Sequence, residues 1–214
     1  MTGTGSASPP ELLVLHAVRI TGMADARAAA SRFRLVLGEV EELVLDFEAY
    51  GWLARVPSAT PTAWSLTEAG RAENERRLAA ELDQAEARVA VAEAHAAFVG
   101  LNGRLLTAVT DWQLRPAPGD PMAANEHDDW RWDERVLDEL GRLGRALVPL
   151  GEQLTAALAR FDGYAERFAV ALGRVECGER RWVDGVGIDS CHRVWFELHE
   201  DLLATLGIDR GAQS

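Results

Sequence analysis

The sequence predicts a mainly helical protein that contains one small β-hairpin. Apolar residues recur at helical spacing in most segments, as where Val40, Leu43, Val44 and Phe47 share one face. Residues 57–62, rich in Pro, Ser and Thr, separate two short extended runs, which is typical of a hairpin. In the rest of the chain, Pro and Gly divide further helical segments from one another.

The first 70 residues contain most of the local signals. Ser8, followed by two prolines and Glu11, favours a helix start. Small residues before it predict a flexible tail at 1–7. The expected elements are helices at about 8–21, 25–33 and 38–48, strands at 50–56 and 63–66, and a further helix that Thr67 caps.

Beyond this region the chain favours helices only. No proline interrupts residues 71–99, so a single helix of roughly 40 Å is expected there. We expect it to pair with its counterpart in a dimer; the alternative is a surface helix of a compact monomer. Further helices are expected at about 133–147, 150–161, 163–175 and 189–206, with a loop at 114–130 and a break at Pro149. These elements predict a domain at 8–70, a linker or dimerisation helix at 71–100, and a helical domain for dimerisation or ligand sensing at 101–214.

Two phrases around the hairpin resemble the winged-helix regulators of the MarR and PadR type. Residues 50–53 read Tyr-Gly-Trp-Leu, and residues 64–71 read Trp-Ser-Leu-Thr-Glu-Ala-Gly-Arg. The resemblance covers the N-terminal third of the chain. It implies a winged helix-turn-helix domain that binds double-stranded DNA, with the third helix in the major groove and the hairpin as the wing. The chain would then be a dimeric transcriptional regulator.

The distribution of charge opposes DNA binding. The chain has 34 acids and 22 bases, a net charge of −12, and every base is arginine. The third helix carries five acids and no base, although attraction to phosphate supplies most non-specific DNA affinity. We therefore expect phosphate contacts from arginines outside that helix, and one or two glutamates that accept a hydrogen bond from cytosine N4. The candidate DNA-binding residues are Arg19, Arg27, Arg32, Arg34, Arg55, Glu39 and Glu42.

The acidic third helix also supports an alternative function. Winged helices serve as protein-docking modules, so the chain could be an adaptor that binds a partner protein and never DNA. A third alternative is a small enzyme or metal-dependent factor that uses the helical domain.

Aromatic residues in the second half predict a pocket for a small-molecule effector. Five of the seven tryptophans follow residue 100, close to histidines, amides and carboxylates, and such groups can line a ligand site. The alternative is simple aromatic packing of a helical bundle. The candidate pocket residues are Trp112, His127, Trp130, Trp182, His192, Trp195 and His199.

Signals for other classes of protein are weak. No signal peptide or membrane span is expected, and the two cysteines, Cys177 and Cys191, do not form a disulfide framework, so a cytoplasmic location is expected. His192 and His199 would lie about 10 Å apart along one helix, too far to share a metal ion. We expect no metal or cofactor, and no enzymatic activity. The enzyme alternative would depend on His127 or His192 as an acid or base.

Overall fold

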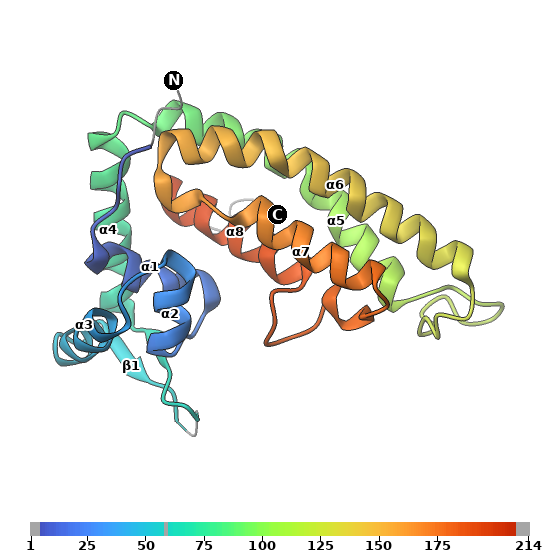
Figure 1. The fold of residues 1–214 in the computed structure, drawn as a ribbon, viewed down its shortest axis with the longest axis horizontal. Helices are drawn as coiled ribbons and strands as arrows, with labels where there is room; N and C mark the ends of the chain where they lie inside the picture. Colours follow the sequence, from blue (N-terminus) through green and yellow to red (C-terminus); the bar gives the residue numbers. More distant parts are fainter. Residues whose placement is uncertain (1–4, 58–59, 209–214) are drawn as a thin grey trace. The chain divides into compact units, whose positions relative to one another are not determined.

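The computed structural model describes residues 5–57 and 60–208 (Figure 1). Within these ranges the chain forms eight α-helices, two short 3₁₀ helices and one two-stranded sheet. The mainly helical fold class is thereby confirmed. Most of the tail expected at 1–7 lies outside the described residues, as do residues 58–59 in the loop of the hairpin.

Contacts within the chain divide it into two units. Unit 1 contains residues 1–91, 155–160 and 197–214, and unit 2 contains residues 92–154 and 161–196. This division differs from the boundaries expected after residues 70 and 100. The reason is that residues 155–160 and 197–208, which were expected in the C-terminal domain, group with the N-terminal residues.

Unit 1 begins with the helices α1 (Pro10–Thr21), α2 (Ala26–Phe33) and α3 (Leu37–Ala49). Strands β1 (Leu53–Arg55) and β2 (Trp64–Leu66) then pair antiparallel, with Leu53 opposite Leu66. The next helix, α4 (Glu68–Gln84), is capped by Thr67, whose hydroxyl accepts a hydrogen bond from the Gly70 N–H at 3.0 Å. These elements lie where the sequence predicts them.

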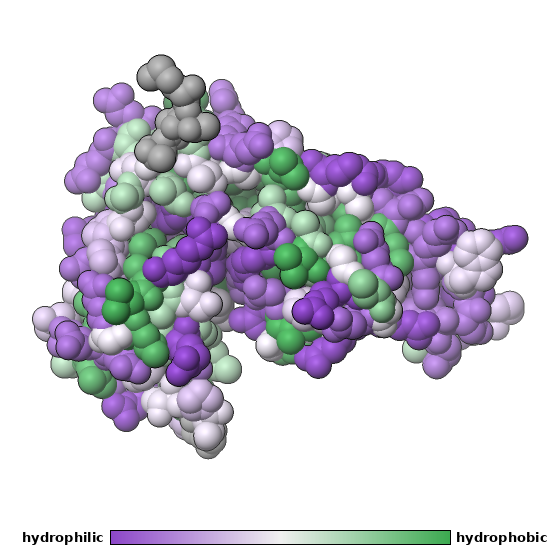
Figure 2. Space-filling view, in the orientation of Figure 1, coloured by the Kyte–Doolittle hydropathy of each residue, from purple (hydrophilic) through white to green (hydrophobic). Residues whose placement is uncertain are grey.

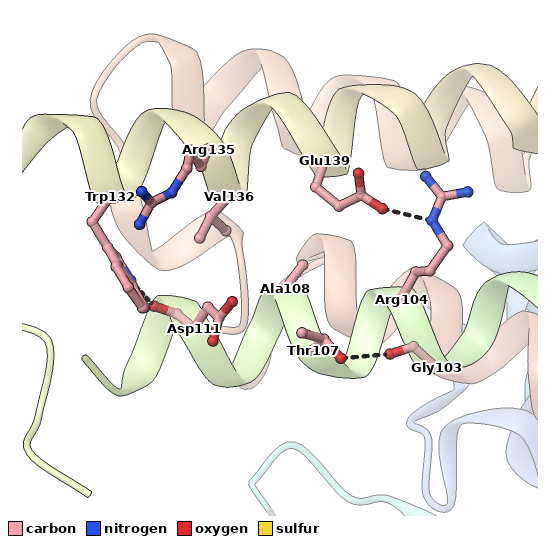
Figure 3. Close-up of a pocket in the computed structure, with 9 residues that line it drawn as sticks. All are labelled: Gly103, Arg104, Thr107, Ala108, Asp111, Trp132, Arg135, Val136 and Glu139. Atoms are coloured by element: carbon pink, nitrogen blue, oxygen red, sulfur yellow. Dashed lines mark hydrogen bonds and ion pairs between the residues drawn. The ribbon is translucent and has the colours of Figure 1, made fainter. Parts of the chain in front are cut away.

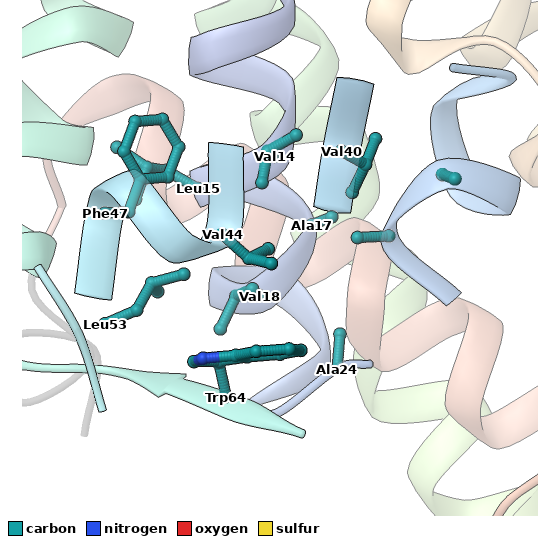
Figure 4. Close-up of a cluster of buried hydrophobic side chains, with 12 residues drawn as sticks. Val14, Leu15, Ala17, Val18, Ala24, Val40, Val44, Phe47, Leu53 and Trp64 are labelled. Carbon is teal, nitrogen blue, oxygen red and sulfur yellow. The ribbon is translucent and has the colours of Figure 1, made fainter. Parts of the chain in front are cut away.

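A buried apolar core joins these helices to the hairpin. Figure 4 shows Val18 of α1, Val44 of α3 and Leu53 of β1 gathered around the Trp64 ring. Val40, Leu43, Val44 and Phe47 of α3 thus face inward, as their spacing predicts. The buried members are Val14, Leu15, Ala17, Val18, Ala24, Ala29, Ala30, Val40, Val44, Phe47, Leu53 and Trp64.

A third backbone segment pairs with the hairpin. Ala24, between α1 and α2, donates its N–H to the Trp64 carbonyl at 3.0 Å and accepts the Trp64 N–H at 2.9 Å. Two such bonds between one pair of residues form an antiparallel bridge. The segment that precedes α2 is therefore attached to β2.

Close packing at Gly70 explains the glycine in the phrase at 64–71. A Cβ on Gly70 would lie 1.9 Å from the Trp52 carbonyl oxygen, well inside van der Waals contact. The same carbonyl accepts the Thr67 N–H at 3.0 Å. The start of α4 therefore lies against the backbone that precedes β1, and only glycine fits there.

The prediction of a single long helix at 71–99 is wrong, because two helices occupy this region. α4 ends at Gln84, and α5 (Arg88–Gln113) follows a turn in which Glu86 has a φ of 51°. The Ala87 N–H bonds the Leu82 carbonyl at 3.1 Å, and the Glu86 N–H bonds the Asp83 carbonyl at 3.2 Å. This pair of bonds is a Schellman motif. Glutamate stands at the left-handed position that usually holds glycine, so the sequence gives no sign of the break.

The prediction that a helix ends at Pro149 is also wrong. α6 (Trp130–Ala157) continues through this residue. Pro149 is exposed, whereas Leu147 and Leu150 continue a row of buried residues that begins at Val136. The proline removes one hydrogen bond on the solvent side, while packing of the buried row holds the helix together.

Unit 2 has an aromatic core. The Trp195 ring stacks on Phe98 at 4.8 Å between centroids and meets the edge of Phe168 at 5.9 Å. Its indole N–H donates to the Asn102 side-chain oxygen at 3.0 Å. The remaining elements of the chain are the 3₁₀ helices η1 (Ala159–Phe161) and η2 (Arg180–Trp182), and the helices α7 (Tyr164–Glu176) and α8 (Cys191–Leu206).

Candidate functional site

A three-residue turn connects α2 to α3. Arg34 adopts a left-handed φ of 55°, and the Leu35 N–H donates to the Ala30 carbonyl at 2.9 Å, which closes α2. At the other end of α2, the Asp25 carboxylate accepts the Ala28 N–H at 2.7 Å. Because both ends of α2 are fixed and the turn is short, the start of α3 is held in place relative to α2.

The outward face of α3 is acidic. It contains exposed glutamates and an aspartate, together with the exposed large apolar residue Leu45, and none of its side chains is basic. The view in Figure 2 is likewise mostly hydrophilic, with small separate apolar patches. The exposed residues of α3 include Glu39, Glu41, Glu42, Leu45 and Asp46.

Glu48, at the end of α3, is tied to the hairpin. Its carboxylate accepts hydrogen bonds from the Arg55 guanidinium at 2.8 Å and from the Trp64 indole N–H at 3.2 Å. The bond from Arg55, followed by that from Trp64, lowers the pKa of Glu48. Arg55 is exposed, as expected, but part of its charge is neutralised by this acid.

The other four candidate arginines divide into two pairs. Arg27 and Arg34 are exposed. Arg19 is held within unit 1, because it bonds Glu75 at 2.9 Å and Glu200 at 2.8 Å and its side chain is only 8% exposed. Arg32 is half-buried, with its guanidinium 4.6 Å from the centre of the Phe33 ring. The sequence did not distinguish these two interior arginines from the two on the surface.

A buried polar network lies inside unit 1, and the sequence did not predict it. Arg160 of η1 bonds Glu81 of α4 at 2.8 Å and the Thr205 hydroxyl of α8 at 2.7 Å, and it also contacts the Asp201 carboxylate. His16 of α1 lies 2.9 Å from the same carboxylate. The network therefore joins four segments that are far apart in the sequence.

Burial and charge shift the pKa values within this network. Burial lowers the pKa of His16, despite the nearby Asp201. Burial alone would raise the pKa of Asp201, but the Arg160 charge holds it well below its usual value. At neutral pH His16 is therefore neutral, Arg160 is charged and Asp201 is ionised. The only sequence signal for it was His16, which interrupts the apolar run from Leu12 to Val18.

The seven candidate pocket residues are distributed over both units. His199 belongs to unit 1 and the other six to unit 2. Trp195 is in the core, Trp130 is 65% exposed, and the Trp182 indole N–H donates to Glu179 at 3.0 Å. His192 is half-buried, and its backbone N–H donates to the Val183 carbonyl at 2.9 Å. Trp112 and His127 are in contact through their rings, whose centroids are 4.4 Å apart.

His127 is part of a small polar cluster at the end of the 114–129 loop. Its Nδ1 lies 3.0 Å from the Asp133 carboxylate, and its backbone has a φ of 57°. The Asn125 amide donates to the Trp112 carbonyl and to Asp133, both at 3.0 Å. These bonds fasten the loop to the start of α6, so a structural role accounts for the cluster.

A cavity of about 300 Å³ lies elsewhere in unit 2, between α5 and α6 (Figure 3). Ala108 and Val136 form its apolar floor. At one end Arg104 bonds Glu139 at 2.6 Å, and at the other the Trp132 indole N–H bonds the Asp111 carbonyl at 2.6 Å. None of the seven candidate residues lines it. The lining residues are Gly103, Arg104, Thr107, Ala108, Asp111, Trp132, Arg135, Val136 and Glu139.

Comparison with known proteins identifies no relative. No family model matches the chain, and no similar curated protein or solved structure was found. Among the described residues, no helix has the length and hydropathy to cross a bilayer. Within the same ranges, no three His, Cys, Asp or Glu residues are grouped closely enough to hold a metal ion.

Proposed function

We propose that residues 8–70 form a winged helix-turn-helix that binds double-stranded DNA, and that the chain is a dimeric transcriptional regulator. The bridge between Ala24 and Trp64 is the observation that carries this proposal. In a winged helix, the segment between the first two helices pairs with the hairpin behind the helix-turn-helix. The three-residue turn between α2 and α3 has the length typical of that motif.

The side chains on this surface have distinct roles in the proposed complex. Arg27 and Arg34, at the two ends of α2, would contact phosphates. Glu39 and Glu42, in the first turns of α3, would accept hydrogen bonds from cytosine N4 in the major groove. Arg55 would contact the flanking backbone from the hairpin, held in position by Glu48.

The acidity of α3 restricts how the protein binds DNA. Three surface arginines in each copy give about six phosphate contacts in a dimer, so the slope of log K against log salt should be about −5. Non-specific affinity should be low, because the acids of α3 repel the phosphates. Base contacts would therefore account for most of the preference between sequences.

Fluorescence anisotropy with charge-reversed variants tests the proposal. The probes are the duplex upstream of the protein's own gene and a scrambled duplex of the same length. We expect Arg27→Glu and Arg34→Glu each to weaken binding by tenfold or more. Arg131→Glu is the matched control, because Arg131 is an exposed arginine of unit 2 that stacks on Trp130. Equal losses in all three variants would contradict the proposal.

A second function, docking of a basic partner protein, is favoured by the exposed acids of α3 and by Leu45, which is 52% exposed among them. Glu39→Gln with Glu42→Gln distinguishes the two functions. On a DNA reader this change should alter sequence preference and strengthen non-specific binding, because two repulsive charges are lost. On an adaptor it should instead weaken binding to a basic peptide, measured by the same anisotropy assay.

We also propose the cavity between α5 and α6 as the effector site. Asp111 and Arg135 turn toward the space between the two helices, above the floor of Ala108 and Val136 (Figure 3). A carboxylate and a guanidinium on an apolar floor suit a small zwitterion, such as a free amino acid with an apolar side chain. Thermal-shift measurements with the common amino acids test this, with Asp111→Asn and Arg135→Gln as variants. A stabilisation that both variants leave unchanged would contradict the assignment.

A further inference from the structure

The centre of the outward face of α3 pairs one acid with one large apolar residue. Figure 4 shows Val40, Val44 and Phe47 of this helix turned toward the core. At about 100° per residue, the positions directly opposite this buried face are 38, 42, 45 and 49. All four residues are exposed, and we name them the outer row: Gly38, Glu42, Leu45 and Ala49. The row therefore presents a carboxylate and an isobutyl group, with a small residue before and after them.

Glu42 and Leu45 are close enough to contact one chemical group together. Residues three apart on a helix are neighbours, with Cβ atoms about 5–6 Å apart. Leu45 is 52% exposed, although the core of unit 1 lies against the opposite face of the helix. If α3 enters the major groove as proposed above, this pair of side chains faces the edges of the bases.

The carboxylate restricts which bases the outer row can contact. An ionised carboxylate only accepts hydrogen bonds, so it suits the N4 amino group of cytosine or the N6 amino group of adenine. It is repelled by O6 and N7 of guanine and by O4 of thymine, because these atoms are acceptors as well. Arginine and lysine, which commonly bind guanine, are absent from α3. Glu42 therefore selects cytosine or adenine.

The leucine narrows this choice further. An apolar side chain in the major groove can contact the methyl group at C5 of thymine. 5-Methylcytosine carries the same methyl group directly beside the N4 amino group, so a single base offers a partner to each of the two side chains. Thymine has the methyl group but presents O4 to the carboxylate. Unmodified cytosine lacks the methyl group, and adenine presents the N7 acceptor beside its amino group.

We propose that the outer row of α3 reads 5-methylcytosine in double-stranded DNA, with Glu42 accepting a hydrogen bond from N4 and Leu45 covering the methyl group. This inference rests on the proposed DNA binding and adds the chemical class of base that α3 reads. It also gives the acid of the outer row a function, because a base at position 42 would favour guanine instead.

Gly38 supports close contact between the outer row and the bases. Glycine inside a helix is less stable than alanine, yet no packing requires it here. A Cβ on Gly38 would meet no atom within 4 Å among the described residues. Without a side chain at this position, the first turn of α3 can approach the floor of the groove, so that Glu42 and Leu45 reach the base edges.

Duplexes with modified cytosines test the inference. Two pools of random duplexes are made, one with cytosine and one with 5-methylcytosine throughout, and the full-length protein selects from each. The duplex enriched from the methylated pool is then synthesised with 5-methylcytosine, cytosine or thymine at each enriched position. Fluorescence anisotropy should show that one 5-methylcytosine binds about fourfold more tightly than cytosine, as expected for burial of one methyl group. Thymine should bind more weakly than 5-methylcytosine by roughly fivefold or more.

Three variants assign the two contacts to their side chains. Leu45→Ala should bring the ratio between the two cytosine forms close to one, with little change in affinity for the unmodified duplex. Glu42→Gln should instead accept thymine in place of 5-methylcytosine, because the glutamine amide can donate a hydrogen bond to O4. The matched control is Val170→Ala on α7, an apolar residue that is 53% exposed and lies outside unit 1. It should leave both ratios unchanged.

The outcomes separate this inference from the proposed function. An enriched duplex that binds equally well or more weakly with 5-methylcytosine would overturn the inference and leave DNA binding intact. A methyl preference that persists in Leu45→Ala would overturn it as well. Failure of the folded protein to bind either pool would overturn both, and would favour a basic partner protein as the ligand of the acidic face of α3.

Discussion

The two units of this molecule place their charges in opposite ways. Unit 1 buries Arg160 with Glu81 and Asp201 in its interior. Unit 2 has ion pairs at its surface, as between Arg142 and Glu139 at 3.1 Å, and aromatic rings in its core. Ion pairs without water require a fixed geometry, whereas apolar side chains can repack with smaller losses. We therefore expect substitutions in the buried network of unit 1 to destabilise the fold more than substitutions at the ion pairs on the surface of unit 2.

The largest expected effect comes from breaking the buried network. Arg160→Leu leaves two carboxylates in the interior without a counter-charge, and should lower the free energy of unfolding by roughly 3–5 kcal/mol. Arg142→Leu is the matched control, since Arg142 also faces two acids but is 55% exposed. Its loss should stay below about 1 kcal/mol. Urea unfolding measures both, and similar losses would contradict the contrast between the units.

Replacing a glycine by alanine should lower the stability of unit 1 at one position and raise the stability of unit 2 at another. Gly70→Ala places a methyl group against the Trp52 carbonyl, and should cost roughly 1–3 kcal/mol through overpacking. Gly173→Ala in α7 meets no neighbour within 4 Å, and should stabilise unit 2 by up to about 1 kcal/mol through helix propensity. Thermal unfolding compares the variants. A stable Gly70→Ala protein would show that the start of α4 can move away from β1.

The smallest expected effect is on the pH dependence of stability. Burial lowers the pKa of His16 below 6.5, so the unfolded chain binds a proton more readily than the folded one. Stability should therefore fall as the pH drops below about 6.5, by at most about 1.4 kcal/mol per pH unit. The negative charge of Asp201 raises the pKa of His16, whereas the positive charges of Arg160 and Arg32 lower it further.

Urea unfolding between pH 7.5 and 5 measures this dependence in the wild type and in His16→Gln. The variant should have the smaller slope. It should keep a residual one, because burial also lowers the pKa of His95 in unit 2. An unchanged slope would mean that His16 does not titrate differently in the folded chain.

The sequence predicted local structure well where side chains act on their own backbone. The inward face of α3, the hairpin and the cap at Thr67 all follow from residues close together in the chain. The failures have a different origin. Pro149 is tolerated because buried leucines hold α6 on the other side. The break after α4 places Glu86, and not a glycine, at the left-handed position.

The candidate site was predictable only in part, for the same reason. The arginines of the first 60 residues look alike in sequence, yet Arg19 turns inward because Glu75 and the distant Glu200 meet it. The cavity of unit 2 is lined by residues from two helices, such as Asp111 and Arg135, which are 24 residues apart in the sequence. Contacts between such distant residues leave no periodic signal, so this cavity could not be predicted from the sequence.

Selection from a pool of random duplexes tests DNA reading by unit 1 most directly. The wild-type protein should enrich a defined sequence made of two inverted half-sites, because a two-fold dimer presents two α3 helices related by symmetry. Arg34→Glu should abolish the enrichment, and Arg131→Glu should leave it unchanged. Failure of the folded, dimeric wild-type protein to enrich any sequence would contradict DNA binding and favour a protein partner for the acidic face of α3.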